Sequence, residues 1–337
     1  MNRSENQIIR TRAYARAGLV GNPSDGYFGK TISFTFRNYY AEVVMYPSRQ
    51  IELLPSQRDR AIYSDLDSVV QSIHQFGYYG GIRLLQASLK RFMEYCKSQE
   101  IELDAGNFSM RYFTNIPTRV GMAGSSAIIT ACFRALMEFY EVDIPQEHLA
   151  NVILSVESEE LGIGAGLQDR VAQVYQGLTF MDFDRDLMAQ QGYGCYESLD
   201  SGGLPNLYVA YKQELSEGSE VFHNDLRARF NAGDSEIVGA MEQWAGFAEQ
   251  VRGCLKTGDL ASIGPLLNSN FDLRRRLCRI HPDNIEMVEA ARAVGASAKF
   301  TGSGGAIVGT IEDDAMFKLL VKKLTPLNVH VFKPEII

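Results

Sequence analysis

The sequence predicts a mixed α+β protein built from two halves. Strand-like and helix-like segments alternate along the chain, and the length of 337 residues favours two domains of ordinary size over one large one. A turn-rich segment, Asp200-Ser-Gly-Gly203, interrupts the pattern, and strand character restarts directly after it. We therefore expect one domain over residues 1–203 and a second over residues 204–337.

In the first half, the spacing of apolar residues indicates each element in turn. Residues 32–44 and 108–114 are rich in β-branched and aromatic residues with partial alternation, which predicts strands. Apolar residues recur at helical spacing in three other segments and predict helices over 84–96, 127–140 and 148–161, the last closed by Gly162. A loop over residues 115–126 leads into the second of these helices.

In the second half, a strand is expected over residues 204–211, followed by three helices over 234–257, 283–294 and 314–323. Between the last two helices lies a glycine loop, KFTGSGGA at 299–306, which runs into a strand over 307–310. No internal repeat and no low-complexity segment interrupts this order.

Composition narrows the function classes. A formal net charge of −8, without a long basic run, argues against a nucleic-acid binder. No run approaches the roughly 18 apolar residues of a membrane helix, and residues 1–12 lack the apolar core of a secretory signal. The five cysteines have no CxxC spacing, which favours reduced thiols in a cytoplasmic protein over a disulfide framework or a zinc site.

The strongest local feature is the segment PTRVGMAGSSA at 117–127. A helix N-terminus offers unpaired N–H groups and a partial positive charge, so it attracts phosphate. Gly121 and Gly124 allow a close approach of backbone to phosphate, and Ser125 and Ser126 can cap the helix or reach a metal or phosphate oxygen. Taken alone, the segment is also an ordinary capping sequence, and it is neither a Walker loop nor a Rossmann fingerprint.

Two further segments give this loop a context: ARAGLVGNPSDGYFGK at 15–30 and KFTGSGGA at 299–306. In this order the three resemble the motifs of the GHMP kinases, over residues 14 to 308. The middle motif is one residue longer here than the usual Gly-Leu-Gly-Ser-Ser-Ala, and Gly21-Asn22-Pro23-Ser24-Asp25 stands where Gly-Glu-His is usual. The resemblance implies a ribosomal protein S5 domain 2-like N-terminal domain, a ferredoxin-like C-terminal domain, and ATP in the cleft between them.

The resemblance also implies roles for individual residues. Asp169 would be the catalytic base, with Arg16 beside it to keep the carboxylate ionised and to stabilise transition-state charge. Ser126 and Glu157 would bind Mg²⁺, while Glu159 and Glu160 fit a solvated helix face, although Glu159 could replace Glu157. ATP would be bound by the middle motif, through Pro117, Val120, Gly121, Met122, Ala123, Gly124, Ser125 and Ser126. Without the motifs, Asp169 would be interpreted as a helix N-cap.

The sequences of several segments, GNPSDGYFGKTIS and GLQDRVAQVY among them, resemble those of the branch of the family that phosphorylates glucuronate. That similarity implies ATP plus D-glucuronate giving glucuronate 1-phosphate and ADP, in salvage toward UDP-glucuronate. Asp25 and Gly304 would contact the sugar, although Asp25 could equally be a turn residue, and Lys30 fits a surface lysine better than a ligand contact. An arginine should hold the sugar carboxylate. Arg83 is the first choice, before Arg170, Arg274, Arg275 and Arg276.

The same residues also allow other functions. The chain could be a different GHMP enzyme, such as a galacturonokinase, a heptose phosphate kinase or a mevalonate-pathway decarboxylase. It could also be a non-catalytic GHMP-fold sensor, whose signature would be the loss of the acids, yet Asp169 and Glu157 are present. A glycine-rich structural protein fits these acids poorly. Small-molecule substrates are expected, with no nucleic-acid or membrane partner, and the oligomeric state is open.

Overall fold

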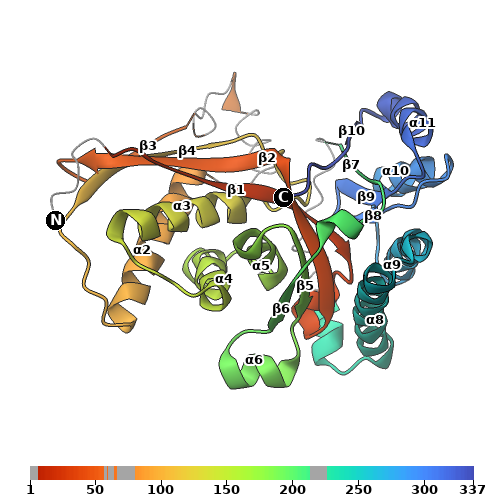
Figure 1. Cartoon of the computed structure of the whole chain (residues 1–337), viewed down its shortest axis with the longest axis horizontal. Coiled ribbons are helices and arrows are strands. Elements are labelled where there is room, and N and C mark those ends of the chain that lie inside the picture. Colours follow the sequence, from red (N-terminus) through yellow and green to blue (C-terminus); the bar gives the residue numbers. More distant parts are fainter. Residues whose placement is uncertain (1–6, 57–58, 60–63, 67–79, 213–225) are drawn as a thin grey trace. The chain divides into compact units, whose positions relative to one another are not determined.

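The structure, a computed structural model, describes residues 7–56, 59, 64–66, 80–212 and 226–337. It contains two compact units, each assembled from separated segments of the chain (Figure 1). The first unit consists of Met1–Tyr14, Tyr39–Ile116 and Gly124–Ala165. The second unit consists of Ala15–Asn38, Pro117–Ala123 and Gly166–Ile337. The boundary expected between residues 203 and 204 stays a prediction.

Two long strands, β1 (Ile9–Val20) and β2 (Lys30–Ser48), contribute to both units. In the first unit, residues 41–48 of β2 pair antiparallel with β4 (Asn107–Thr114), and β4 pairs parallel with β3 (Glu52–Leu54). Side chains of β4 alternate between buried and exposed over much of its length, as expected for a strand with one face on a core.

Helices of the first unit whose bounds the structure describes include α2 (Gly81–Ser98), α3 (Gly124–Tyr140) and α4 (Gln146–Ser155), the last continued by a π-helical turn η3 (Val156–Glu160). Helices α2 and α3 lie along the same face of the strands (Figure 1). Their apolar stripes meet where Phe92 contacts Phe133 edge-on, with ring centroids 6.0 Å apart. Phe108 of β4 contacts Phe139 in the same way, at 5.3 Å, so helix and strand share one core.

The strands β1 to β6 belong to one sheet, in the order β3, β4, β2, β5 (Leu178–Asp182) and β6 (Cys195–Leu199), with β1 paired to β2. In the second unit, residues 30–34 of β2 pair with β5, which pairs with β6, and α5 (Leu167–Tyr175) packs against β5. The second sheet is antiparallel, in the order β10 (His330–Phe332), β7 (Leu207–Tyr211), β9 (Ala306–Thr310) and β8 (Lys299–Phe300). The short α6 (Arg185–Gln191) begins at the N-cap Asp184.

The second unit also contains α8 (Ser235–Thr257), α9 (Ile263–Leu277), α10 (Pro282–Arg292) and α11 (Asp314–Leu324), and residues 226–231 are helical as well. Its 3-10 turns are η1 (Ser24–Tyr27), η4 (Ser201–Gly203), η5 (Leu260–Ser262) and η6 (Thr325–Leu327). Helix α8 packs on α9 around the fully buried Trp244, whose Nε1 donates to the carbonyl of Asn270 at 3.0 Å. Phe271 of α9 contacts Phe300 of β8 at 5.2 Å, which joins this helix pair to the antiparallel sheet.

The mixed α+β character and the expected helices and strands are confirmed, with corrections at their boundaries. Helix α3 begins at Gly124 instead of residue 127, because the backbone becomes helical directly after Ala123. The helix expected over 148–161 ends its α-helical part at Ser155 and continues as a π-helical turn. Strand β7 begins at Leu207 instead of residue 204. No helix among the described residues is long and apolar enough to span a membrane.

Candidate active site

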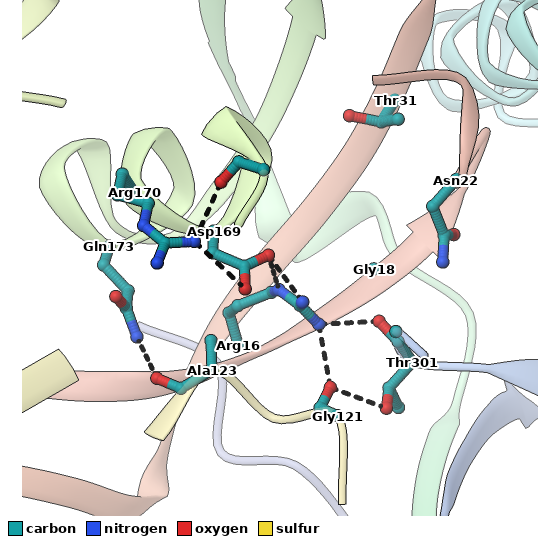
Figure 2. A network of polar contacts seen from close by, with 12 residues as sticks. Arg16, Gly18, Asn22, Thr31, Gly121, Ala123, Asp169, Arg170, Gln173 and Thr301 are labelled. Carbon is teal, nitrogen blue, oxygen red and sulfur yellow. Dashed lines mark hydrogen bonds and ion pairs between the residues drawn. The ribbon is translucent and has the colours of Figure 1, made fainter. Parts of the chain in front are cut away.

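The side chain of Arg16 is the centre of a polar network in the second unit (Figure 2). Its Nε and Nη2 donate to Oδ1 of Asp169 at 2.8 and 2.5 Å. Its Nη1 donates to the carbonyl oxygens of Gly121 at 2.9 Å and Thr301 at 2.7 Å. Arg16 is only 5% exposed, so these acceptors replace the water that a guanidinium otherwise binds. One arginine thus joins the expected catalytic acid to the middle and late loops.

Asp169 lies in the first turn of α5, whose N-cap is Gly166. The interpretation of Asp169 as an N-cap is therefore not borne out by its position: the carboxylate accepts hydrogen bonds from Arg16 instead of from the helix backbone. Its second oxygen lies 3.7 Å from Nη1 of Arg170, which also donates to the carbonyl of Gly166 at 2.9 Å. The Asp169 side chain keeps 22% of its surface exposed, so one side of the carboxylate remains accessible to a small molecule.

The loop Pro117–Ala123 has an unusual backbone. Arg119, Gly121 and Ala123 have positive φ angles of 59°, 70° and 60°, a region that residues other than glycine adopt rarely. Such a concentration of costly conformations is typical of ligand-binding loops, and alternation of φ sign is the pattern that forms anion-binding concavities. The carbonyl of Ala123 accepts a hydrogen bond from Gln173 Nε2 at 2.9 Å, which ties the loop to α5.

The late glycine loop approaches this loop closely. A Cβ added at Gly121 would lie 3.0 Å from the carbonyl oxygen of Gly304, and one at Gly302 would lie 2.8 Å from that of Gly121. Arg274 of α9 holds the late loop by donating to the carbonyls of Gly302 at 2.8 Å and Ser303 at 2.6 Å. Gly304 itself has a φ of 147°, so glycine is required at that position for conformational reasons as well.

Asp25 lies in η1, close to the Arg16–Asp169 pair. A Cβ added at Gly166 would lie 2.9 Å from Oδ2 of Asp25, which places the carboxyl against the start of α5. Burial, and next the charge of Asp169, raise the pKa of Asp25 to about 7, while Arg16 acts in the opposite direction. A carboxyl group with that pKa can accept or donate a hydrogen bond near neutral pH, which suits contact with a sugar hydroxyl.

Beneath the first motif lies Lys299 of β8, which is 1% exposed. Its Nζ donates to the carbonyl of Gly18 at 2.6 Å and to Oδ1 of Asn22 at 2.5 Å. Burial, together with the positive charges of Arg274 and Arg16, lowers the pKa of Lys299 well below its ordinary value. Lys299 therefore holds the first motif through its hydrogen bonds to Gly18 and Asn22 and is not exposed to solvent.

The two expected Mg²⁺ ligands lie in the first unit and are both buried. Ser126 in the first turn of α3 is 1% exposed, and Glu157 in η3 is 3% exposed. A hydroxyl and a carboxylate supply the hard oxygen atoms that Mg²⁺ prefers, so the two residue types fit the ion by their chemistry. Glu159 and Glu160 instead form ion pairs with Arg91 at 2.8 Å and Lys90 at 2.5 Å.

The remaining expected residues lie on other elements and have contacts of their own. Arg83 is exposed near the start of α2 in the first unit. Lys30 forms ion pairs with Asp182 at 3.1 Å and Glu249 at 2.7 Å, as a structural surface lysine would. Arg275 pairs with Glu289 at 2.8 Å.

Sequence reasoning missed several residues of the network. Thr301 was expected only as part of a loop, yet its Oγ1 donates to the carbonyl of Gly121 at 3.1 Å and its own carbonyl accepts from Gly18 N at 2.8 Å. Strand β1 was also missed, and Arg16 lies on it. The signal was present in the alternation of buried Ile9, Thr11 and Ala13 with exposed neighbours.

Comparison with known protein families gives two matches. Residues 83–177 match the family described as "GHMP kinases N terminal domain", and residues 251–322 match "GHMP kinases C terminal". Among curated proteins, the sequence is 45% identical over 307 residues to "Glucuronokinase 1" of Arabidopsis thaliana, covering 89% of this chain and 84% of that protein. It is 23% identical to a D-glycero-alpha-D-manno-heptose 7-phosphate kinase of Campylobacter jejuni, covering 88% of this chain and 87% of that one.

Solved structures with the same fold include the mevalonate kinase of Methanococcus jannaschii, at a TM-score of 0.73 and 17% identity over 99% of this chain and all of that one. The Lactococcus lactis galactokinase solved with galactose matches at a TM-score of 0.75 and 15% identity, covering 99% of this chain and 94% of that one. At these identities the likeness concerns the fold alone. It confirms the two-domain mixed α+β fold class that the sequence predicts.

Proposed function

This chain belongs to the GHMP kinase family, and we propose that it transfers the γ-phosphate of ATP to the anomeric hydroxyl of D-glucuronate. The membership confirms the resemblance drawn from the three sequence motifs. The chain is an ATP-dependent sugar kinase, and its extended similarity to a glucuronokinase favours glucuronate over the other sugars and small molecules that the family accepts.

The observation that carries this function is the pairing of the buried Arg16 with the partly exposed carboxylate of Asp169. Phosphoryl transfer from ATP requires a positioned acceptor hydroxyl and fixed positive charge near the transferred group. In the proposed reaction, Asp169 accepts the proton of the sugar hydroxyl, and that hydroxyl oxygen forms the new bond to the γ-phosphorus as the bond to the β,γ-bridging oxygen breaks. Arg16 holds the carboxylate in one orientation through two hydrogen bonds to the same oxygen.

The middle motif is proposed to bind the phosphates of ATP, through Pro117, Val120, Gly121, Met122, Ala123, Gly124, Ser125 and Ser126. The positive φ angles at alternate positions of the loop support this role, because they turn backbone N–H groups toward a common side. The loop leads directly into α3, so the first N–H groups of that helix continue the row of donors.

Mg²⁺ is proposed to bind Ser126 and Glu157. When bound, the ion would neutralise charge on the ATP phosphates, and one hydroxyl and one carboxylate are sufficient protein ligands, because Mg²⁺ keeps several waters. Glu157 is supported over Glu159, which is 64% exposed and forms an ion pair with Arg91.

Asp25 and Gly304 are proposed to contact the sugar. The half-buried carboxyl of Asp25 lies near Asp169. This position suits a group that orients the sugar hydroxyl next to the reacting one. We place the reaction in the cytoplasm, in salvage of glucuronate toward UDP-glucuronate. The five cysteines, all unpaired in the structure, support a reducing compartment.

A coupled assay of ADP release with a panel of acceptors tests this function. Glucuronate should give the highest kcat/KM, ahead of galacturonate, glucose, galactose, a heptose 7-phosphate and mevalonate. A neutral hexose or mevalonate as the best acceptor would refute the proposed substrate. The absence of ADP release with every acceptor would refute the kinase activity itself.

A further inference from the structure

A kinase acting on a sugar acid needs a cation for the carboxylate of its substrate, and most cations near Asp25 already have partners. Arg16 binds Asp169 and two backbone carbonyls. Arg274 donates to two carbonyls of the late loop, and Lys299 donates to Gly18 and Asn22. All three side chains are at least 94% buried and serve the scaffold of the site. The substrate carboxylate therefore requires a different side chain.

Arg227 is such a side chain. It is exposed, and it forms no hydrogen bond or ion pair with any residue that the structure describes. Its guanidinium lies over the ring of Tyr27, 4.5 Å from the centroid. A Cβ added at Gly26 would lie 3.2 Å from its Nη2, so the guanidinium reaches the backbone directly after Asp25. An arginine whose N–H groups have no acceptor among the described residues thus lies beside the residue proposed to bind the sugar.

The contact with Tyr27 prepares Arg227 to bind an anion. Stacking on an aromatic face fixes the plane of a guanidinium and leaves the N–H groups along its edge available for two parallel bonds to a carboxylate. Tyr27 itself is held in the core by Phe230, with ring centroids 5.0 Å apart, and is 4% exposed. The tyrosine ring is therefore a fixed platform for the guanidinium.

We propose that Arg227 binds the carboxylate of the sugar-acid substrate and gives the enzyme its preference for a uronate over a neutral sugar. The inference rests on the proposed function and adds the residue that recognises the acid group. Asp25 of η1 would then bind a hydroxyl of the sugar, and Arg227, whose guanidinium lies against η1, would bind the carboxylate. Glycine at position 26 leaves the space that the guanidinium occupies.

The test compares glucuronate with glucuronamide, its neutral counterpart of nearly the same shape. In Arg227→Gln, the ratio of kcat/KM for glucuronate to that for glucuronamide should fall roughly 10- to 100-fold, the loss expected for charge-assisted hydrogen bonds. Arg227→Lys keeps the charge but not the planar pair of donors, so its ratio should lie between those of the wild type and the glutamine variant. Titration calorimetry with the same two sugars gives the preference independently of turnover.

Arg229→Gln is the matched control, because Arg229 lies two residues away and its guanidinium is engaged by Asp234 at 2.8 Å and Glu236 at 3.0 Å. Its ratio should equal that of the wild type. An unchanged ratio in Arg227→Gln would overturn the inference, and so would a selective loss in Arg83→Gln instead. A wild-type protein that binds glucuronate more tightly than glucuronamide, yet does not phosphorylate it, would refute the proposed function alone.

Discussion

Replacement of Asp169 by asparagine removes the proposed base and keeps the shape of its side chain. Oδ1 accepts both hydrogen bonds from Arg16, and an amide oxygen in its place can accept the same two. The amide nitrogen would take the place of Oδ2, which lies 3.7 Å from Nη1 of Arg170, far enough to tolerate a second donor. Asp169→Asn is therefore expected to fold and to bind ATP like the wild type.

The expected size of each effect follows from these contacts. Exchanging the charged acceptor for a neutral one weakens two charge-assisted hydrogen bonds by about 1 kcal/mol each and leaves the buried Arg16 guanidinium without its counter-charge, so a loss of about 2–4 kcal/mol in the free energy of unfolding is expected. Loss of a positioned general base costs roughly 10²- to 10⁴-fold in rate, because an amide cannot accept the proton. The signature of a base is this loss of kcat in a protein that is still folded and still binds ATP.

The assay measures kcat by ADP release, ATP affinity by titration calorimetry and stability by urea unfolding. Asp272→Asn is the matched control, because this aspartate also pairs with an arginine, Arg292, at 2.6 Å. Its kcat should be unchanged. If Asp169→Asn keeps more than about a tenth of the wild-type kcat, outside the range for loss of a base, the reasoning is refuted.

Four other substitutions test the proposed Mg²⁺ ligands, Asp25 and the middle loop. Ser126→Ala and Glu157→Gln should each raise the Mg²⁺ concentration needed for half-maximal turnover, since each removes an oxygen ligand; unchanged Mg²⁺ dependence in both, with unchanged circular dichroism, would place the ion elsewhere. The pKa of Asp25 is raised to about 7 in the folded protein, so the protonated carboxyl stabilises the fold at low pH, and this stabilisation is lost as the pH rises from 3.8 to about 7. In Asp25→Asn, the free energy of unfolding should therefore decline less over that pH range. An equal decline in the wild type and the variant, measured by urea unfolding at each pH, would contradict this. Gly121→Ala should lower the free energy of unfolding by about 1–2 kcal/mol, because φ is 70° there, and should raise the KM for ATP. Gly239→Ala is the control: its position in α8 has open space around it, so this substitution should not lower the free energy of unfolding.

Much of the fold could be predicted because local patterns dictate it. The helix expected over 84–96 is α2 with a few more residues at each end, and its apolar stripe is the buried face. Strand β1 was missed because the alternation of buried and exposed residues covers only its first half, whereas residues 15–20 are all buried, the charged Arg16 among them. Arg10 and Arg12 point to the surface while Arg16 is buried, and only tertiary contacts distinguish them.

The acidic residues of the candidate site could be predicted from the sequence, but the hydrogen bonds that join distant segments there could not. Arg16 bonds to residues 105 and 285 positions away, and no local pattern relates such distant segments. The sequence also favours an exposed lysine at position 299, because charged side chains are seldom fully buried. Its burial depends on Gly18 and Asn22, which supply acceptors that only the folded first motif brings together.

The most direct test of the central claim is the identity of the phosphorylated product. The protein is incubated with ATP, Mg²⁺ and D-glucuronate, and the sugar product is analysed by ³¹P and ¹H NMR. We expect one sugar phosphate whose phosphorus couples to the anomeric proton, formed in equal amount with ADP and lost in Asp169→Asn. A phosphate on any other hydroxyl, or ADP formed without a sugar phosphate, would contradict the account.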